Sequence, residues 1–162
     1  IPANGVLGRL NLVYPREWFA GLAARTFNDP AGAGASFTSA RAIIDKVLRD
    51  QPDYAPALSL LGRIDAVLGR KDEAIAEARR ACELMPLSKD AAIGAGLMVD
   101  LATVYTWVGE KVLAIEILAA VMKFPNGPSY GFLKYDPKWD PLRGDPRFEQ
   151  IVASLAPTAP KQ

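Results

Sequence analysis

The chain has 162 residues, half of them hydrophobic, and its 19 Lys and Arg against 18 Asp and Glu leave a formal net charge of +1. This length supports one globular domain with its own core, and the balanced charge argues against a nucleic-acid binder, which normally carries a basic face. With no histidine and one cysteine, the chain has no Ser-His-Asp triad, Cys-His pair, His-ligated zinc site or internal disulfide.

Helical periodicity runs through most of the chain. Ala, Leu and Ile recur at helical spacing, and alternating β-branched runs are scarce. Gly and Pro divide this pattern into segments of ordinary helix length. We expect a loop over the Gly-rich stretch 28–34, and helix caps at Asp53, Ser88 and Asp145. The pattern predicts helices over 15–27, from Ser36 or Thr38 to 49, and over 54–68, 71–84, 88–108, 110–123, 129–134 and 145–155.

The chain termini and the distribution of charge along the chain indicate where in the cell the protein works. No apolar stretch is long enough for a membrane span, and the first residues lack the basic and apolar regions of a signal peptide. Charge is even along the chain, so no arm for nucleic acid or membrane is expected. The lone Cys82 suits a reducing compartment, and we expect a cytoplasmic protein. Because the chain does not begin with Met, we expect it to be processed or, more simply, a fragment of a longer protein.

A period of 34 residues separates Pro52 from Pro86, and Ala40 from Ala74. A fixed spacing of this size is typical of stacked supersecondary units. The pattern is sharpest between residues 55 and 86. Its recurring bulky, small and helix-breaking positions are Leu58, Leu61, Gly62, Gly69, Ala74, Ala81 and Pro86.

At these positions the segment resembles a tetratricopeptide repeat (TPR), a helix-turn-helix unit of about 34 residues. Gly62 and Ala74 stand where the two helices of such a unit cross closely, and Pro86 stands at the turn into the next unit. The following unit matches less fully, and the preceding one keeps little beyond Ala40, Ile44 and Pro52. Atypical terminal repeats are common in such arrays.

The resemblance implies an all-α fold, an α-α superhelix of about three TPR-like helix pairs with a C-terminal capping helix. The whole chain, 1–162, is then a single TPR-like domain. Independently of the resemblance, three Asp-Pro steps in the C-terminal segment predict turns that let Trp139, Leu142 and Phe148 fold over the last helix pair as a lid. The implied divisions are repeats at about 15–52, 53–86 and 88–125, the lid at 126–156 and a frayed tail at 157–162.

Three Asp-Pro steps in the C-terminal segment, the first at Asp136, support a narrower likeness. Together with the segments 84–90 and 107–111, they resemble the TPR regions of bacterial signalling proteins that carry Ser/Thr kinase, adenylate cyclase or transcriptional-regulator domains. This resemblance implies that the chain is part of a larger signalling or regulatory protein.

In TPR proteins the first helices of the units line a concave face. The resemblance implies that this face holds an extended peptide or a partner helix, with Arg63 meeting a carboxylate and Trp107 giving apolar contact. The alternative is a solvated face with Trp107 in the core. Too few Lys, Arg and Asn residues are present for the family's peptide-carboxylate clamp. The candidate binding residues are Arg25, Ser59, Arg63, Val99, Thr103, Thr106 and Trp107.

Two further residues have competing interpretations. Asp65 stands where the repeat usually has an aromatic residue, so it is either a buried carboxylate paired with Arg41, Arg79 or Lys89, or a polar contact in a ligand groove. Cys82 is interpreted as a buried structural thiol rather than a reactive one.

These observations favour a non-catalytic protein–protein interaction scaffold. We expect no enzyme, no metal, no cofactor, and neither nucleic acid nor membrane as partner. One alternative is a small-ligand-binding domain or an enzyme that works without histidine, through carboxylate, Arg or Tyr groups. Another is a structural spacer, or a module that forms a homodimer through the exposed end of the repeat stack.

Overall fold

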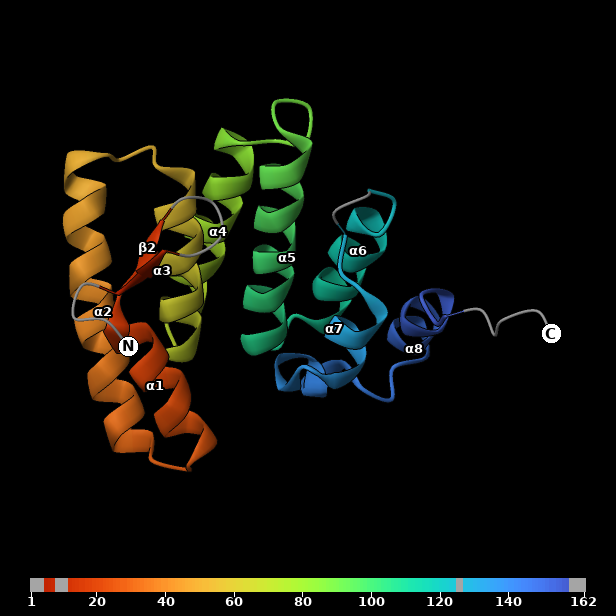
Figure 1. Ribbon diagram of the computed structural model, residues 1–162, viewed down its shortest axis with the longest axis horizontal. Coiled ribbons are helices and arrows are strands. Elements are labelled where there is room, and N and C mark those ends of the chain that lie inside the picture. The colour runs from red at the N-terminus through yellow and green to blue at the C-terminus, as the bar shows by residue number, and fades with distance from the viewer. Residues whose placement is uncertain (1–4, 8–11, 125–126, 158–162) are drawn as a thin grey trace.

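The computed structural model describes residues 5–7, 12–124 and 127–157, and this part of the chain is almost entirely helical (Figure 1). A small antiparallel ribbon, β1 (Val6–Leu7) and β2 (Val13–Tyr14), precedes the helices and pairs Val6 with Tyr14. The helices are α1 (Arg16–Thr26), α2 (Pro30–Asp50), α3 (Ala55–Val67), α4 (Lys71–Leu84), α5 (Ala91–Trp107), α6 (Lys111–Val121), α7 (Tyr130–Tyr135), the 3-10 helix η2 (Pro137–Leu142) and α8 (Pro146–Ser154).

Consecutive helices pack in pairs, α1 with α2, α3 with α4 and α5 with α6. Neighbouring pairs meet where α2 contacts α3 and where α5 contacts both α3 and α4. Figure 1 shows these helices side by side, with η2 below the end of α5 and α7 and α8 beyond α6. The expected all-α class is confirmed, with the short ribbon as an addition.

The α3/α4 pair is held close by a glycine. A Cβ built on Gly62 would lie 2.8 Å from the backbone oxygen of Ala74 and 3.2 Å from the Cβ of Ala78. Only a residue without a side chain allows this approach. Ala74 and Ala78 are themselves buried. The expectation that Gly62 and Ala74 must be small is therefore met by the geometry of the crossing.

The predicted loop over 28–34 is wrong, because α2 already begins at Pro30. The Asp29 carboxylate accepts a hydrogen bond of 2.9 Å from the Gly32 backbone N–H, and Pro30 occupies the first turn. An acidic cap followed by proline starts a helix strongly enough to carry it through the glycines. Ser36 and Thr38 consequently lie inside α2 and are not its caps.

Two other predicted caps are also wrong. Asp90, not Ser88, caps α5 by accepting hydrogen bonds from the backbone N–H groups of Ala92 and Ile93, each at 2.9 Å. Asp53 does not cap α3, and instead forms a 3.1 Å ion pair with Arg80. The expected Asp145 cap is confirmed by a 2.9 Å bond from the backbone N–H of Arg147.

The core has two main clusters. Trp18, Phe37 and Ile64 belong to the one between α1, α2 and α3. The other, around α5 and α6, includes the fully buried side chains of Trp139 and Phe148 from the C-terminal segment. Trp139, Leu142 and Phe148 therefore pack as the sequence predicted. The predicted end of the third repeat, Pro125, and the predicted tail from residue 158 onward lie outside the described residues.

Among the described helices, none combines the length and the apolar character that a membrane crossing needs.

Candidate binding groove

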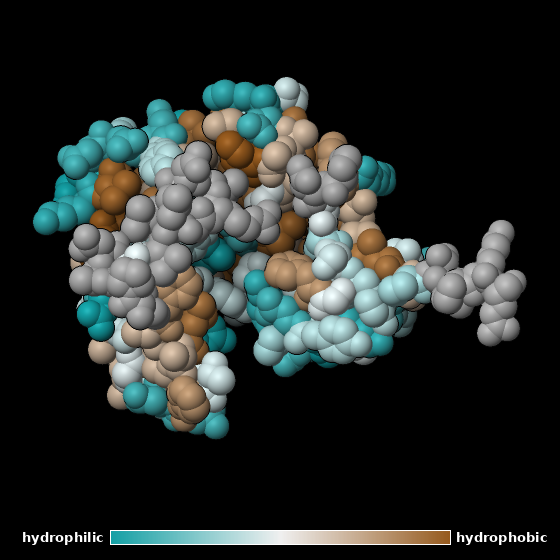
Figure 2. Space-filling view, in the orientation of Figure 1, coloured by the Kyte–Doolittle hydropathy of each residue, from teal (hydrophilic) through white to brown (hydrophobic). Residues whose placement is uncertain are grey.

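Two adjoining cavities lie between α1, α2, α3, α5 and η2, and together we call them the groove. The first, the α2 cavity, has a volume of about 380 Å³ and the second, the η2 cavity, about 610 Å³. Arg25, Trp107 and Pro141 line both. Figure 2 shows the surface hollowed between the α1 side and the η2 side of the molecule.

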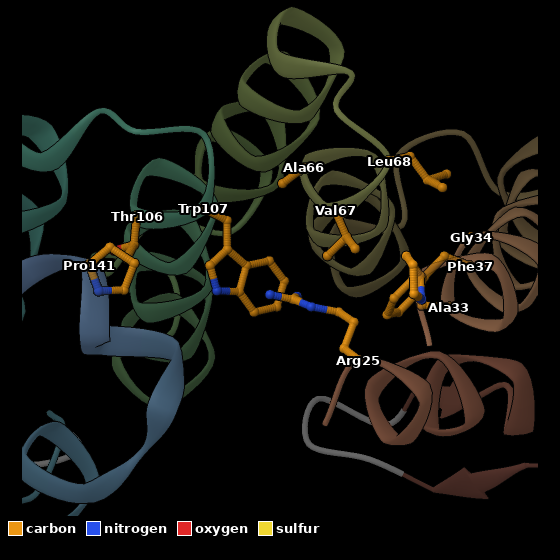
Figure 3. Close-up of a pocket in the computed structure, with 11 residues that line it drawn as sticks. Arg25, Ala33, Gly34, Phe37, Ala66, Val67, Leu68, Thr106, Trp107 and Pro141 are labelled. Carbon is orange, nitrogen blue, oxygen red and sulfur yellow. The ribbon is translucent and has the colours of Figure 1, made fainter. Parts of the chain in front are cut away.

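The two cavities are lined by different residues. Most residues that line the α2 cavity are apolar, among them Phe37 from α2 and Val67 from α3 (Figure 3). Charged residues are more numerous in the lining of the η2 cavity. Besides the shared residues, its lining consists of Trp18, Leu22, Thr26, Arg63, Thr103, Asp136, Pro137 and Lys138.

Arg25 reaches from the last turn of α1 across the groove. Its guanidinium carbon lies 5.1 Å from the centre of the Trp107 ring, and Figure 3 shows the guanidinium over the indole. This is the distance of a cation–π contact. The residue is exposed, so the contact is held by stacking and not by burial. Arg25 and Trp107 thus form the boundary between the two cavities.

Arg63 lies at the inner wall of the η2 cavity, and its side chain is only 12% exposed. It donates a 2.7 Å hydrogen bond to the Tyr14 hydroxyl and forms a 3.3 Å ion pair with Asp100. Its guanidinium also lies 5.0 Å from the ring centre of Trp18. Burial acts to lower the pKa of Arg63, but Asp100 and Tyr14 hold it above its ordinary value. Arg63 is therefore committed to internal contacts.

Five of the seven candidate residues come together in the groove, namely Arg25, Arg63, Thr103, Thr106 and Trp107. The two threonines contribute little exposed surface, because each hydroxyl donates to a carbonyl of its own helix.

Ser59 and Val99 are buried and line neither cavity of the groove. Ser59 donates a 2.9 Å hydrogen bond to Asp100 across the contact between α3 and α5. At this contact each helix covers the other, so Ser59 is not exposed to the groove.

The repeat positions did not predict the groove residues that come from α1, α2 and η2, apart from Arg25. Trp18 and Leu22 come from α1, Phe37 from α2 and Lys138 from η2. The sequence signal for the η2 wall was the run of Asp-Pro steps, since Asp136, Pro137 and Pro141 all belong to it. That signal predicts turns and does not say which surface the turns face.

Asp65 lies outside the groove lining, fully buried between α2 and α4. It accepts hydrogen bonds from Arg41 Nε at 2.7 Å and Nη2 at 3.2 Å, and Arg70 Nε lies 3.6 Å away. The expected pairing with Arg41 is confirmed. Arg79 instead donates to the hydroxyl of Tyr105. A fully paired, buried carboxylate fits the structural interpretation of Asp65.

Two further titratable groups have strongly shifted pKa values. Burial raises the pKa of Glu77 to about 8, with the Asp65 charge adding to the effect. The Oε2 atom of Glu77 is buried and has no hydrogen-bond partner among the residues that the structure describes. Burial also raises the pKa of the Cys82 thiol to about 12, with a smaller contribution from Asp100. Such a thiol is a weak nucleophile. Cys82 is nevertheless only partly buried and lines a separate cavity, so the expected full burial is not met.

No cluster of three or more Cys, Asp or Glu side chains in the described part of the chain is arranged to hold a metal ion. No family model and no curated protein matches the chain.

Proposed function

We propose that this protein is a TPR-like interaction module that binds an extended peptide or a partner helix in the groove. The observation that carries the proposal is the shared boundary of the two cavities. There an exposed arginine and a tryptophan meet between a cavity lined mostly by apolar residues and one lined by several charged residues. Clefts that pair aromatic and arginine anchors in this way are typical of protein recognition surfaces.

The arrangement of the helices supports the TPR-like part of the proposal. Three consecutive helix pairs pack against one another, and the α3/α4 pair crosses closely at Gly62. The first helices of the pairs, α1, α3 and α5, all line the groove, and α2 adds a wall of the α2 cavity. In the family that the sequence resembles, the first helices line the concave face.

A small-molecule site is the alternative with some support, since the η2 cavity has the volume of an ordinary ligand pocket, within roughly 300–1,000 Å³. The arrangement of charges favours a peptide. Asp65, the carboxylate that a compact polar site would use beside Arg63, pairs with Arg41 away from the groove. The groove is also walled by five helices, α1, α2, α3, α5 and η2, and opens between α1 and η2, which suits a partner longer than a metabolite.

We further propose that the module belongs to a larger bacterial signalling or regulatory protein and works in the cytoplasm without catalysis of its own. The C-terminal Asp-Pro segment supports this placement by its resemblance to such proteins. Trp139 and Leu142 hold that segment against the core, so that η2 forms a wall of the groove.

A groove-filling variant tests the proposal. Gly34 lines the α2 cavity, and a Cβ built there meets no atom within 4 Å. The Gly34→Trp side chain should therefore fill the cavity without disturbing the helix. Gly131→Trp is the matched control, because Gly131 is equally open and helical but lines neither groove cavity.

Both variants and the original chain are challenged with a displayed library of random peptides. The proposal expects enrichment of related peptides on the original chain and on Gly34→Trp a loss of that enrichment, with Gly131→Trp unaffected. No enrichment on any chain, or equal enrichment on all three, contradicts binding in the groove.

A further inference from the structure

Of the three cationic side chains described in the lining of the groove, two form ion pairs with carboxylates and one does not. Arg63 faces Asp100 at 3.3 Å, and Lys138 faces Asp136 at 3.0 Å. Arg25 forms no ion pair with any residue that the structure describes, and it is held only by stacking on Trp107. Among the described lining residues, Arg25 is therefore the one cation without a carboxylate partner, and it lies at the boundary of the two cavities.

A guanidinium stacked on an indole keeps its N–H edge available. Stacking uses the face of the planar group, whereas a carboxylate binds in the plane, through two parallel N–H···O bonds. The indole also fixes the plane of the arginine, so less side-chain entropy is lost when a ligand binds. Arg25 is thus prepared for an anion that approaches from the η2 cavity or from the open side of the groove.

We propose that Arg25 selects the partner, and that the partner is a peptide with one acidic side chain next to a large apolar one. The inference rests on the proposed function. The acidic group pairs with Arg25 in the plane of its guanidinium. The apolar side chain enters the α2 cavity against Val67 and Leu68, which are both partly exposed. The one unpaired cation among the described lining residues matches the single charge of a carboxylate.

A phosphorylated peptide would fit less well. A phosphate group carries close to two charges and is usually held by a cluster of arginines. Here the two other cations beside the η2 cavity, Arg63 and Lys138, are already paired with carboxylates, and Arg63 is largely buried. A phosphate in the η2 cavity would face Asp136, and the described lining residues offer no further free cation to offset that charge.

The test uses an array of short synthetic peptides in matched sets. Each set keeps one Leu or Phe and places Glu, Gln, Lys or phosphoserine at the same neighbouring position. The array is probed with the original chain, with Arg25→Glu and with Arg16→Glu. Arg16 is the control, because it is an exposed arginine on the same helix and lines neither cavity of the groove.

The inference expects Glu peptides to bind the original chain and Arg16→Glu about tenfold or more tightly than their Gln counterparts, which is the range of a charge-assisted pair. Arg25→Glu should lose this preference and favour Lys peptides. The preference should also weaken as salt is raised.

Three outcomes overturn the inference. If Glu and Gln peptides bind equally, the groove binds peptides but Arg25 does not select them, and the proposed function survives. If phosphoserine peptides bind more tightly than Glu peptides, the partner is a phosphorylated peptide and not one with an acidic side chain. If no peptide binds any chain, the proposed function fails together with the inference.

Discussion

The Arg63 guanidinium donates a 2.7 Å hydrogen bond to the hydroxyl of Tyr14 and ties α3 to the strand before α1. The same guanidinium pairs with Asp100 on α5 and stacks on Trp18 of α1. One side chain thus joins the ribbon, α1, α3 and α5 beneath the groove. Arg63 therefore has a structural role, whereas the sequence suggested a contact for a partner.

Replacing Arg63 should cost stability. Arg63→Glu leaves Asp100 facing a second carboxylate in a largely buried place, and we expect a loss of about 3–5 kcal/mol in the free energy of unfolding. Arg25→Glu removes only an exposed stacking contact and should cost less than about 1 kcal/mol. Urea unfolding followed by tryptophan fluorescence measures both. Equal losses would contradict the different roles assigned to these two arginines.

Two glycines should respond oppositely to alanine. At Gly62 the added Cβ would meet the α4 backbone at 2.8 Å, so Gly62→Ala should destabilise by about 1–3 kcal/mol. At Gly34 the added Cβ meets nothing within 4 Å, and Gly34→Ala should stabilise α2 by roughly 0.5–1 kcal/mol. Thermal unfolding of the two variants checks the order. A gain in stability for Gly62→Ala would show that the crossing is looser than described.

Glu77 should make the protein less stable as pH rises. Its pKa is about 8 in the folded chain against 4.5 as its ordinary value, so the folded chain keeps the proton where the unfolded chain has lost it. The stabilising contribution of protonated Glu77 to the free energy of unfolding is thus complete below pH 4.5 and is lost as pH rises to about 8.

Glu77→Gln removes this dependence. Relative to the original chain, the variant should gain stability between these pH values, by about 1 kcal/mol once solvent screening of the half-buried group is allowed for. Urea unfolding at a series of pH values measures the difference. A difference that stays constant with pH would contradict the assignment.

Cys82 should react slowly while the chain is folded. Burial raises the pKa of its thiol to about 12, so little thiolate is present at pH 8. An aromatic disulfide reagent should label folded protein about a hundredfold more slowly than protein in urea. Comparable labelling rates would indicate that the thiol is accessible and not the structural group described above.

The sequence predicted a helix well where residues typical of both a helix start and a helix end were present. The bounds of α4, Lys71–Leu84, follow from the acidic first turn and the proline that comes after the helix. The start of α2 was missed because the two glycines suggested a loop, whereas Asp29 and Pro30 together initiate the helix. A cap contributes about 1 kcal/mol, enough to offset a glycine in the next turn.

The sequence predicted part of the candidate site, because the local helical pattern determines which residues share one side of a helix. The helical register brought Arg25, Arg63 and Trp107 to one side of the helices. It could not show that Ser59 would be covered by the α3–α5 contact, nor that η2 would close the far side of the groove. Both depend on packing between segments far apart in the chain, which a local pattern does not record.

The most direct test of the groove is the NMR signal of the Trp107 indole N–H during titration with a peptide selected from the library. Trp107 lines both cavities, whereas Trp139 is fully buried and lines neither, so the two indoles serve as probe and control. Binding in the groove predicts a saturable shift of the Trp107 signal, little change at Trp139, and loss of the shift in Gly34→Trp. Saturable binding that leaves the Trp107 signal unmoved would contradict it and place the partner on another face.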